Sequence, residues 1–142
     1  MESLAINDNI KLEPSQKNDA ILAKILWLLV EEFGLSMADA SVLIDVKKRT
    51  LYQARKSKAL PQPSRDRYRR IGLLLGIKKN LEILFPRNPE VRRNWLHIPR
   101  ETFKEKSAIS MIKDSPLESM SRLFTVRRLL DMLRNGTIHS IT

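Results

Sequence analysis

The chain has 142 residues, no cysteine and a formal net charge of +10. Its length suits one ordinary domain or two very small ones, and it allows a core that needs no disulfide or metal. The absence of cysteine excludes disulfide frameworks, thiol catalysis and cysteine-ligated zinc. No apolar stretch approaches the roughly 18 residues of a membrane span and no signal-peptide pattern is present, so we expect a cytoplasmic protein without a membrane partner.

The positive charge is concentrated in one part of the sequence. Residues 47–70 carry ten Lys and Arg side chains and a single acid, Asp66. Residues 1–46 carry 3 basic and 8 acidic side chains, and residues 71–142 carry 13 basic and 7 acidic ones. This concentration favours a polyanionic partner, most simply nucleic acid. The alternative is a solvated basic face that only keeps the protein soluble.

The N-terminal part predicts a tail and a first helix. Residues 1–18 are polar without a sustained period, and we interpret them as a flexible tail. From Asp19 onward, apolar residues recur every three or four positions until Gly34, which ends the helix. The apolar positions expected on one helix face are Ile21, Leu22, Ile25, Leu28 and Leu29.

Two shorter helices are predicted next. Ser36 is a good N-cap for a second helix over residues 37–44, and Asp45 breaks this helix. A third helix is predicted over residues 47–56. The segment that follows, residues 59–64, contains two prolines and is therefore a linker.

A longer fourth helix is predicted after the linker. Ser64 can cap this helix, which continues toward residues 81–85. Gly72 and Gly76 lie one turn apart on it. They indicate either close helix packing or a break at Gly76.

The last third of the chain predicts three further helices joined by a connection. Asn88 followed by Pro89 is typical of a helix start, residues 97–107 are a connection, and Ser107 can cap a short helix over residues 108–113. The final helix has the strongest local signals: Ser115 as N-cap, Pro116 at the first position, Glu118 closing a capping box, and Gly136 as the stop. Its apolar positions are Met120, Phe124, Leu130 and Leu133, mixed with the stems of Arg127 and Arg128. No strand-like alternation is present, so the predicted fold class is all-α.

The second and third helices fit a helix-turn-helix, in which two helices cross around a small core. A small residue, Ser41, lies at the expected crossing point. The positions expected to face inward are Ala40, Ile44, Val46, Leu51 and Ala54, and those expected to face outward are Lys47, Lys48, Arg49, Tyr52, Gln53 and Lys56. The turn usually has a left-handed Gly where this chain has Asp45, but Asp tolerates that conformation better than most residues.

The outward side chains have the chemistry of a DNA-reading helix. Lys and Arg can reach guanine edges or phosphates, and Gln can pair with adenine. A helix that begins with Lys-Lys-Arg is unfavourable in isolation, because its N-terminus is already positive, and an anionic partner would offset this. We assign DNA contact to the six outward residues and to Ser36. Two ordinary amphipathic helices with a basic face are the alternative.

Residues 35–56 resemble the Xre-type helix-turn-helix of phage and plasmid repressors. Residues 84–138 resemble the toxin-binding domain of the Xre/MbcA/ParS antitoxins. The features that carry this second resemblance are Leu84-Phe85-Pro86, Trp95-Leu96, Pro99, Phe103, the short helix over residues 107–112 and the long final helix that ends at Gly136. With the helices around the first motif, the resemblance covers about residues 19–138.

The resemblance implies a two-domain antitoxin, with a helix-turn-helix domain over residues 19–77 and a toxin-binding domain over residues 78–142. Such a protein would neutralise a toxin, typically of the NAD-consuming RES type, and would repress its own operon as a homodimer on operator DNA. It would itself bind no cofactor. By matched position, the resemblance implicates a C-terminal segment in toxin binding, comprising Arg134, Asn135, Gly136, Thr137 and Ile138.

Two large apolar residues have two interpretations. Trp95 and Phe103 lie in a polar region, and Trp is enriched at the centres of interfaces. The other interpretation is that both residues close a small helical core.

We expect no enzyme activity and no metal site. Neither His97 nor His139 has a metal-ligand spacing with another histidine. The segment around Gly76 lacks the Lys-Ser/Thr of a phosphate-binding loop, and the basic half has no acidic cluster for nuclease metal ions. The remaining alternatives are a stand-alone repressor with a C-terminal dimerisation domain and a general DNA-coating protein.

Overall fold

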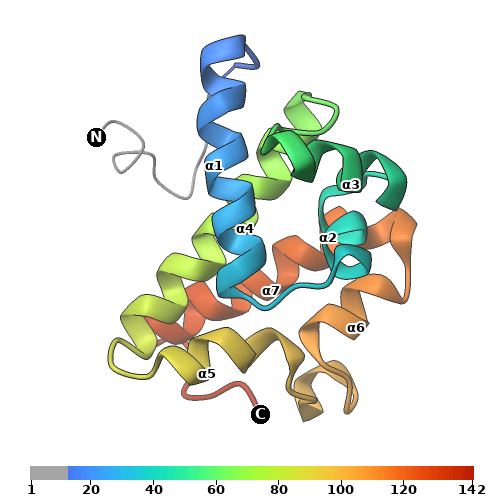
Figure 1. Cartoon of the computed structure of the whole chain (residues 1–142). Coiled ribbons are helices and arrows are strands. Elements are labelled where there is room, and N and C mark those ends of the chain that lie inside the picture. Colours follow the sequence, from blue (N-terminus) through green and yellow to red (C-terminus); the bar gives the residue numbers. More distant parts are fainter. Residues whose placement is uncertain (1–12) are drawn as a thin grey trace.

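The structure is a computed structural model that describes residues 13–142. The first part of the predicted tail, residues 1–12, lies outside the described residues. Within residues 13–142 the chain forms helices and no strand, which confirms the all-α fold class (Figure 1). The α-helices are α1 (Gln16–Glu32), α2 (Met37–Ile44), α3 (Lys48–Ser57), α4 (Arg65–Leu84), α5 (Pro89–Asn94), α6 (Ala108–Lys113) and α7 (Ser119–Arg134). No helix in this part of the chain is long and apolar enough to cross a membrane.

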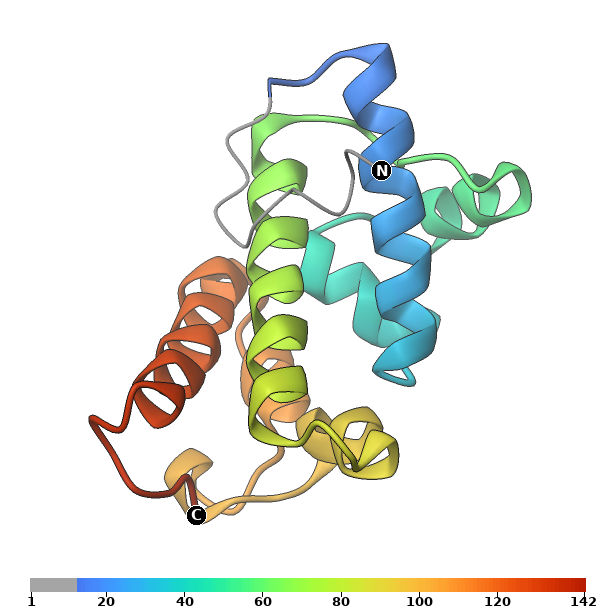
Figure 2. The same ribbon diagram turned by 90° about the vertical axis from the view of Figure 1, so that its left-hand side faces the viewer.

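Helix α4 is the centre of the fold. Helix α1 packs against one side of α4, and α7 packs along another (Figures 1 and 2). All residues from Ile71 to Ile77 are buried, as expected for a helix enclosed by its neighbours. The predicted domain boundary between residues 77 and 78 falls inside this helix, which continues to Leu84.

Gly76 of α4 allows Arg127 of α7 to approach closely. A Cβ atom at Gly76 would lie 2.6 Å from Nε of Arg127 on α7. The Arg127 side chain therefore occupies the space that any other residue at position 76 would need. Helix α4 has no break at Gly76, so close packing is the correct one of the two predicted alternatives.

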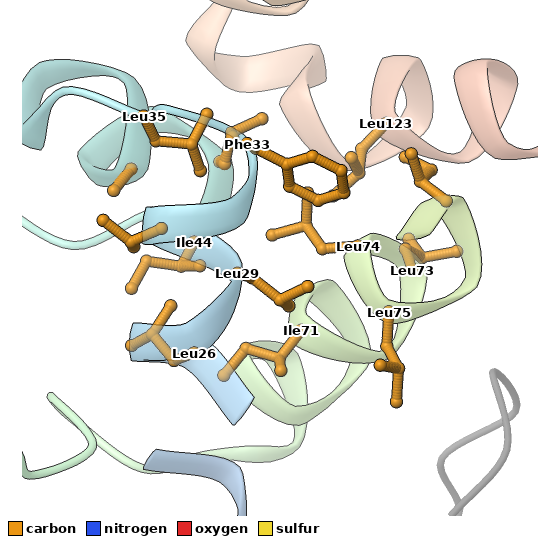
Figure 3. Close-up of a cluster of buried hydrophobic side chains, with 14 of the residues drawn as sticks. Leu26, Leu29, Phe33, Leu35, Ile44, Ile71, Leu73, Leu74, Leu75 and Leu123 are labelled. Carbon is orange, nitrogen blue, oxygen red and sulfur yellow. The ribbon is translucent and has the colours of Figure 1, made fainter. Parts of the chain in front are cut away.

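One hydrophobic core connects the two halves of the chain. Figure 3 shows Leu29 of α1, Ile44 of α2 and Leu74 of α4 in one cluster, with Leu123 of α7 at its edge. The same core continues to Trp95, where the second half of the chain closes over the end of the bundle. Burial of this apolar surface is the main source of stability for such a fold.

The first helix differs from its prediction at two points. It begins at Gln16 instead of Asp19, because Ser15 caps it by accepting a hydrogen bond from the Asn18 backbone N–H at 3.1 Å. Leu28, predicted on the inner face, is 47% exposed. The core instead takes up Leu26 and Trp27, and the Trp27 indole N–H donates to the Ala59 carbonyl, after α3, at 3.0 Å.

The final helix also differs from its prediction. Residues 116–118 form a 3₁₀ turn, η4, and α7 begins only at Ser119. The predicted capping box is wrong, because the Glu118 carboxylate accepts a hydrogen bond from Arg122 at 3.0 Å instead. The predicted apolar stripe is partly wrong as well: Phe124 is 52% exposed, whereas the residues buried against α4 are Leu123, Val126 and Leu130.

The other helix ends follow their local signals. Ser36, Ser64 and Ser107 each accept a hydrogen bond from the backbone N–H three residues later, as predicted. Gly34 and Gly136 have positive φ angles of 58° and 76°, which suit the ends of α1 and α7. Helix α5 begins at Pro89 as expected, but the Asn88 side chain makes no capping bond. The connection before α6 contains two 3₁₀ turns, η2 (Trp95–His97) and η3 (Glu101–Phe103).

Candidate nucleic-acid interface

A tight turn joins α2 to α3. Asp45 ends α2 with a left-handed φ of 56°, which is the conformation expected at this position. The Ser41 hydroxyl donates a hydrogen bond to the Val46 carbonyl at 2.5 Å, and the Val46 N–H donates to the Ser41 carbonyl at 3.0 Å. These two bonds fix the direction in which α3 leaves the turn.

The inner positions of this unit are buried as predicted. Ala40, Ile44, Val46 and Leu51 are each less than 5% exposed, and Ala54 is half-buried. Leu51 is the one fully buried residue of α3, so it anchors the helix on the core. Because Leu51 and the half-buried Ala54 hold α3 on the core, the opposite face of the helix stays exposed.

All seven residues assigned to DNA contact are exposed. Six of them lie on the outer face of α3 or just before it: Lys47, Lys48, Arg49, Tyr52, Gln53 and Lys56. Ser36 lies at the start of α2, where its side chain caps the helix by accepting from the Asp39 N–H. Within residues 13–142, none of the four cations in this set forms an ion pair with a carboxylate.

The N-terminus of α3 strengthens the positive potential of this face. Lys47 occupies the N-cap position and makes no side-chain capping bond. The first backbone N–H groups of α3 therefore keep their capacity to donate to an external acceptor. The positive end of the helix dipole and three adjacent cations favour an anion such as a phosphate group at this place.

Two arginines of the basic window turn inward and serve the fold. Arg67 donates to the Asp45 carbonyl at 2.5 Å and so braces the turn between α2 and α3. Arg70 is only 6% exposed and donates to the Leu43 carbonyl at 3.2 Å and to the Ser119 hydroxyl at 2.8 Å. Sequence reasoning missed both roles, although Asp66 lies four residues before Arg70, a spacing that suits the 2.9 Å ion pair between them.

An ion pair connects the start of α2 to the end of α6. The Lys113 ammonium donates to the Asp39 carboxylate at 2.9 Å, and the other oxygen of Asp39 accepts from the Ser36 N–H at 3.2 Å. Burial opposes the charge on Asp39, but the bonds to Lys113 and Ser36 outweigh it and hold the pKa of Asp39 below its usual value of 3.8. The carboxylate thus fixes the α2 N-terminus against the second half of the chain.

The pKa of Asp39 predicts how the protein responds to acid. Because the folded-state pKa is lowered, the charged carboxylate stabilises the fold above pH of about 4, and this contribution is lost as the pH falls through the folded-state pKa. We expect Asp39→Asn to cost about 1 kcal/mol at neutral pH and to converge with the wild type in acid. Urea unfolding at several pH values in the acid range measures the difference in the free energy of unfolding between the wild type and Asp39→Asn. Lys113→Met should remove part of this difference, because the ammonium group that pairs with Asp39 is lost. If the stabilities of the wild type and Asp39→Asn changed in parallel with pH, the stabilising role of the charged Asp39 would be contradicted.

The segment assigned to toxin binding lies at the end of α7. Arg134, Asn135, Gly136 and Thr137 are exposed, and Ile138 is half-buried. The Thr137 N–H donates to the Met132 carbonyl at 2.9 Å, which closes the helix end. Further on, Ile141 is buried, and the Thr142 carbonyl oxygen accepts from the Thr102 hydroxyl at 2.7 Å. The segment is therefore an exposed turn held at both ends.

Trp95 and Phe103 belong to the core, being 4% and 6% exposed. The Arg100 guanidinium lies 4.1 Å from the centre of the Trp95 ring and donates to the Trp95 carbonyl at 3.2 Å. Burial of this group lowers the pKa of Arg100. The burial of both aromatic residues supports the interpretation that they close the core.

Neither a scan of protein-family models nor a search of curated proteins finds a match to this chain. In the described part of the chain, no group of three or more His, Cys, Asp or Glu side chains could hold a metal ion.

Proposed function

We propose that this protein is a DNA-binding antitoxin. It binds operator DNA with α3, represses its own operon, and neutralises an NAD-consuming toxin of the RES type with the end of α7. The observation that carries the DNA-binding part is the outer face of α3. There four cations that pair with no described carboxylate accompany Tyr52 and Gln53 on a helix anchored by Leu51. The toxin-binding part is supported by the resemblance of residues 84–138 to the antitoxin domain.

The geometry of α3 suits the major groove of DNA. The groove admits one α-helix, and a protruding helix with a polar outer face can bring side chains to the base edges. The uncapped first turn and Lys47, Lys48 and Arg49 would approach phosphates or guanine edges. Gln53, one turn further along the same face, would contact a base edge, and Lys56 would contact the backbone.

Two substitutions distinguish base reading from phosphate binding. We expect Gln53→Ala to weaken binding to the preferred site by roughly 1–3 kcal/mol and to relax the sequence preference. Lys56→Ala should weaken binding to all sequences and reduce the salt slope by about one unit. Both are exposed helical residues, so neither change should unfold the protein. Fluorescence anisotropy with specific and random duplexes measures the difference, and an equal loss on all DNA in both variants would contradict the role of Gln53.

The end of α7 can be tested without removing its anchors. Truncation of residues 134–142 should abolish neutralisation more than DNA binding, but it would also remove the buried Ile141. The sharper variant is Arg134→Glu with Thr137→Glu, since both residues are exposed. We expect this variant to lose rescue of toxin-expressing cells while keeping its DNA affinity. Arg128→Glu, an exposed cation on the same helix, is the control, and unchanged rescue by the double variant would refute the assignment of this segment.

The antitoxin proposal itself is tested with the reading frame beside this gene. Growth and cellular NAD are measured in cells that express the neighbouring frame, with and without this protein. The proposal expects the neighbour alone to arrest growth and deplete NAD, and this protein to restore both. Rescue from growth arrest with steady NAD would support the antitoxin role and contradict the assignment of the toxin to the NAD-consuming RES type. A neighbour without toxicity would contradict the proposal.

A stand-alone repressor is the second candidate. The observation that favours it is the shared core, because the second half of the chain packs on α4 and could act only as a support for α2 and α3. In that case charge reversal at the end of α7 would change nothing, and repression would not depend on any toxin.

A further inference from the structure

Helix α3 is attached to the rest of the molecule at few points. In Figure 2 it lies at the edge of the molecule, and the linker after it runs back to the start of α4. Leu51 is its one fully buried residue. Just beyond the helix, the Ala59 carbonyl accepts a hydrogen bond from the Trp27 indole N–H of α1 at 3.0 Å. The direction of α3 therefore depends on how the segments before and after it are held.

One guanidinium group joins these two segments. Nη2 of Arg67 donates to the Asp45 carbonyl, in the turn before α3, at 2.5 Å. The same atom donates to Oε1 of Gln62, in the linker after α3, at 3.2 Å. Arg67 lies in the first turn of α4, and its side chain is only 16% exposed. Because the guanidinium is planar and rigid, it holds the chain on both sides of α3 at fixed positions relative to α4.

Both residues that Arg67 binds have an unfavourable backbone conformation. Asp45 and Gln62 have left-handed φ angles of 56° and 42°, and neither is a glycine. Residues with a side chain enter this region at a cost in free energy, and they stay there only where the surroundings hold them. At Asp45 the backbone N–H is bound within α2, and Arg67 is the group from another helix that binds its carbonyl.

We propose that Arg67 is the positioning residue of α3 and does the work of the glycine that such a turn usually has. Its bond to the Asp45 carbonyl keeps the turn left-handed, and this conformation sets the direction in which α3 leaves the core. Arg67 itself faces inward and contacts no DNA. The consequence for DNA rests on the proposed function, whereas the effect on the direction of α3 does not.

The surroundings of Arg67 allow its side chain to be replaced without leaving a charge unpaired. The carboxylate of Asp66 lies 3.6 Å from Nη1 of Arg67 and keeps its closer ion pair with Arg70, at 2.9 Å. Ser64 caps α4 by accepting from the backbone N–H of residue 67, at 3.1 Å, and any residue except proline supplies this donor. Arg67→Met therefore keeps the start of α4 and the apolar stem, and it removes the bonds of the guanidinium.

Residual dipolar couplings of the whole protein, measured by NMR without DNA, test the direction of α3. In the wild type, the amide couplings of α3 should fit one common orientation with those of α1, α4 and α7. We expect Arg67→Met to lose this fit for α3 alone, because the turn no longer stays left-handed. Arg69→Met is the matched control, since Arg69 is an exposed cation two residues away on the same helix, and it should fit as the wild type does. Equal fits for the two variants would overturn the proposal.

Rescue by glycine distinguishes positioning from a general loss of stability. Glycine adopts the left-handed conformation without the cost that Asp45 has. Asp45→Gly should therefore restore the fit of α3 in the Arg67→Met variant, and it should change nothing when Arg67 is present. Circular dichroism verifies that each variant is folded. A double variant in which α3 remains displaced would show that Arg67 does not act through the turn.

On DNA, the inference expects a loss of affinity without the loss of a phosphate contact. Arg67→Met should weaken binding to the preferred site about tenfold and leave the salt slope unchanged, since no cation that contacts a phosphate is removed. Addition of Asp45→Gly should recover most of this affinity. A salt slope reduced by about one unit would make Arg67 a phosphate contact and would contradict its role as a positioning residue.

The two measurements separate this inference from the proposed function. A wild type that binds no DNA, with α3 displaced in Arg67→Met and restored by Asp45→Gly, keeps the positioning role and removes the function. A wild type that binds a defined DNA site, with Arg67→Met binding equally well, keeps the function and removes the positioning role.

Discussion

The double charge reversal Lys48→Glu with Arg49→Glu should abolish DNA binding, with a loss of about a hundredfold or more at low salt. Both side chains are exposed in the first turn of α3, and no described carboxylate pairs with them. The change removes two cations and places two anions at the helix end that has no side-chain cap. The salt dependence of the residual binding should fall by about two units, since two phosphate contacts are lost.

A control with the same change in net charge distinguishes a local effect at α3 from an effect of total charge. Arg87→Glu with Arg128→Glu also replaces two exposed cations, but these lie after α4 and on α7. Anisotropy titrations at several salt concentrations should show a small loss for this control and a large one for the α3 variant. Equal losses would mean that the affinity follows total charge, and the protein would then be a general DNA-coating protein.

The second large effect concerns Arg70, which connects three helices. Its guanidinium pairs with Asp66 of its own helix and bonds the Leu43 carbonyl at the end of α2 and the Ser119 hydroxyl at the start of α7. Replacement by Met keeps the apolar stem but leaves a buried carbonyl and a buried hydroxyl without this donor. We expect Arg70→Met to lower the free energy of unfolding by about 2–4 kcal/mol.

The neighbouring Arg69 provides the matched control for this substitution. Arg69 is exposed and has no described ion-pair partner, so Arg69→Met should change stability by less than about 0.5 kcal/mol. Urea unfolding monitored by circular dichroism measures both variants. If Arg70→Met were as stable as Arg69→Met, the bonds from Arg70 to α2 and α7 would contribute nothing to the fold.

Much of the helix pattern was predictable from the sequence because its causes are local. Ser36, Ser64 and Ser107 cap helices through bonds to residues three positions away, and Gly34 and Gly136 adopt the left-handed conformation that ends a helix. The buried positions of the α2–α3 unit were also predictable, since Ile44 and Leu51 follow from the spacing of apolar residues. The exposure of Gln53 and of the cations on α3 follows from the same spacing.

The errors arose where distant parts of the chain decide the outcome. Leu28 and Phe124 have helical spacing that suits burial, but the faces of α1 and α7 that carry them receive no covering helix among the described residues. Within the basic window, Arg70 is buried because α2 and α7 supply acceptors that lie 27 and 49 residues away. No local pattern distinguishes this arginine from the exposed Arg69. The basic surface was therefore visible in outline, while its division into inward-facing and exposed cations required the fold.

The most direct test of the proposed function is a selection of bound DNA from a pool of random duplexes. The wild-type protein and the Lys48→Glu/Arg49→Glu variant are each used to capture duplexes over several rounds, and the captured sequences are compared. A recognition helix at α3 predicts that the wild type enriches one defined sequence and that the variant enriches none. A wild type that captures DNA without enriching any sequence, or a variant that enriches the same sequence equally well, would contradict the central role of α3.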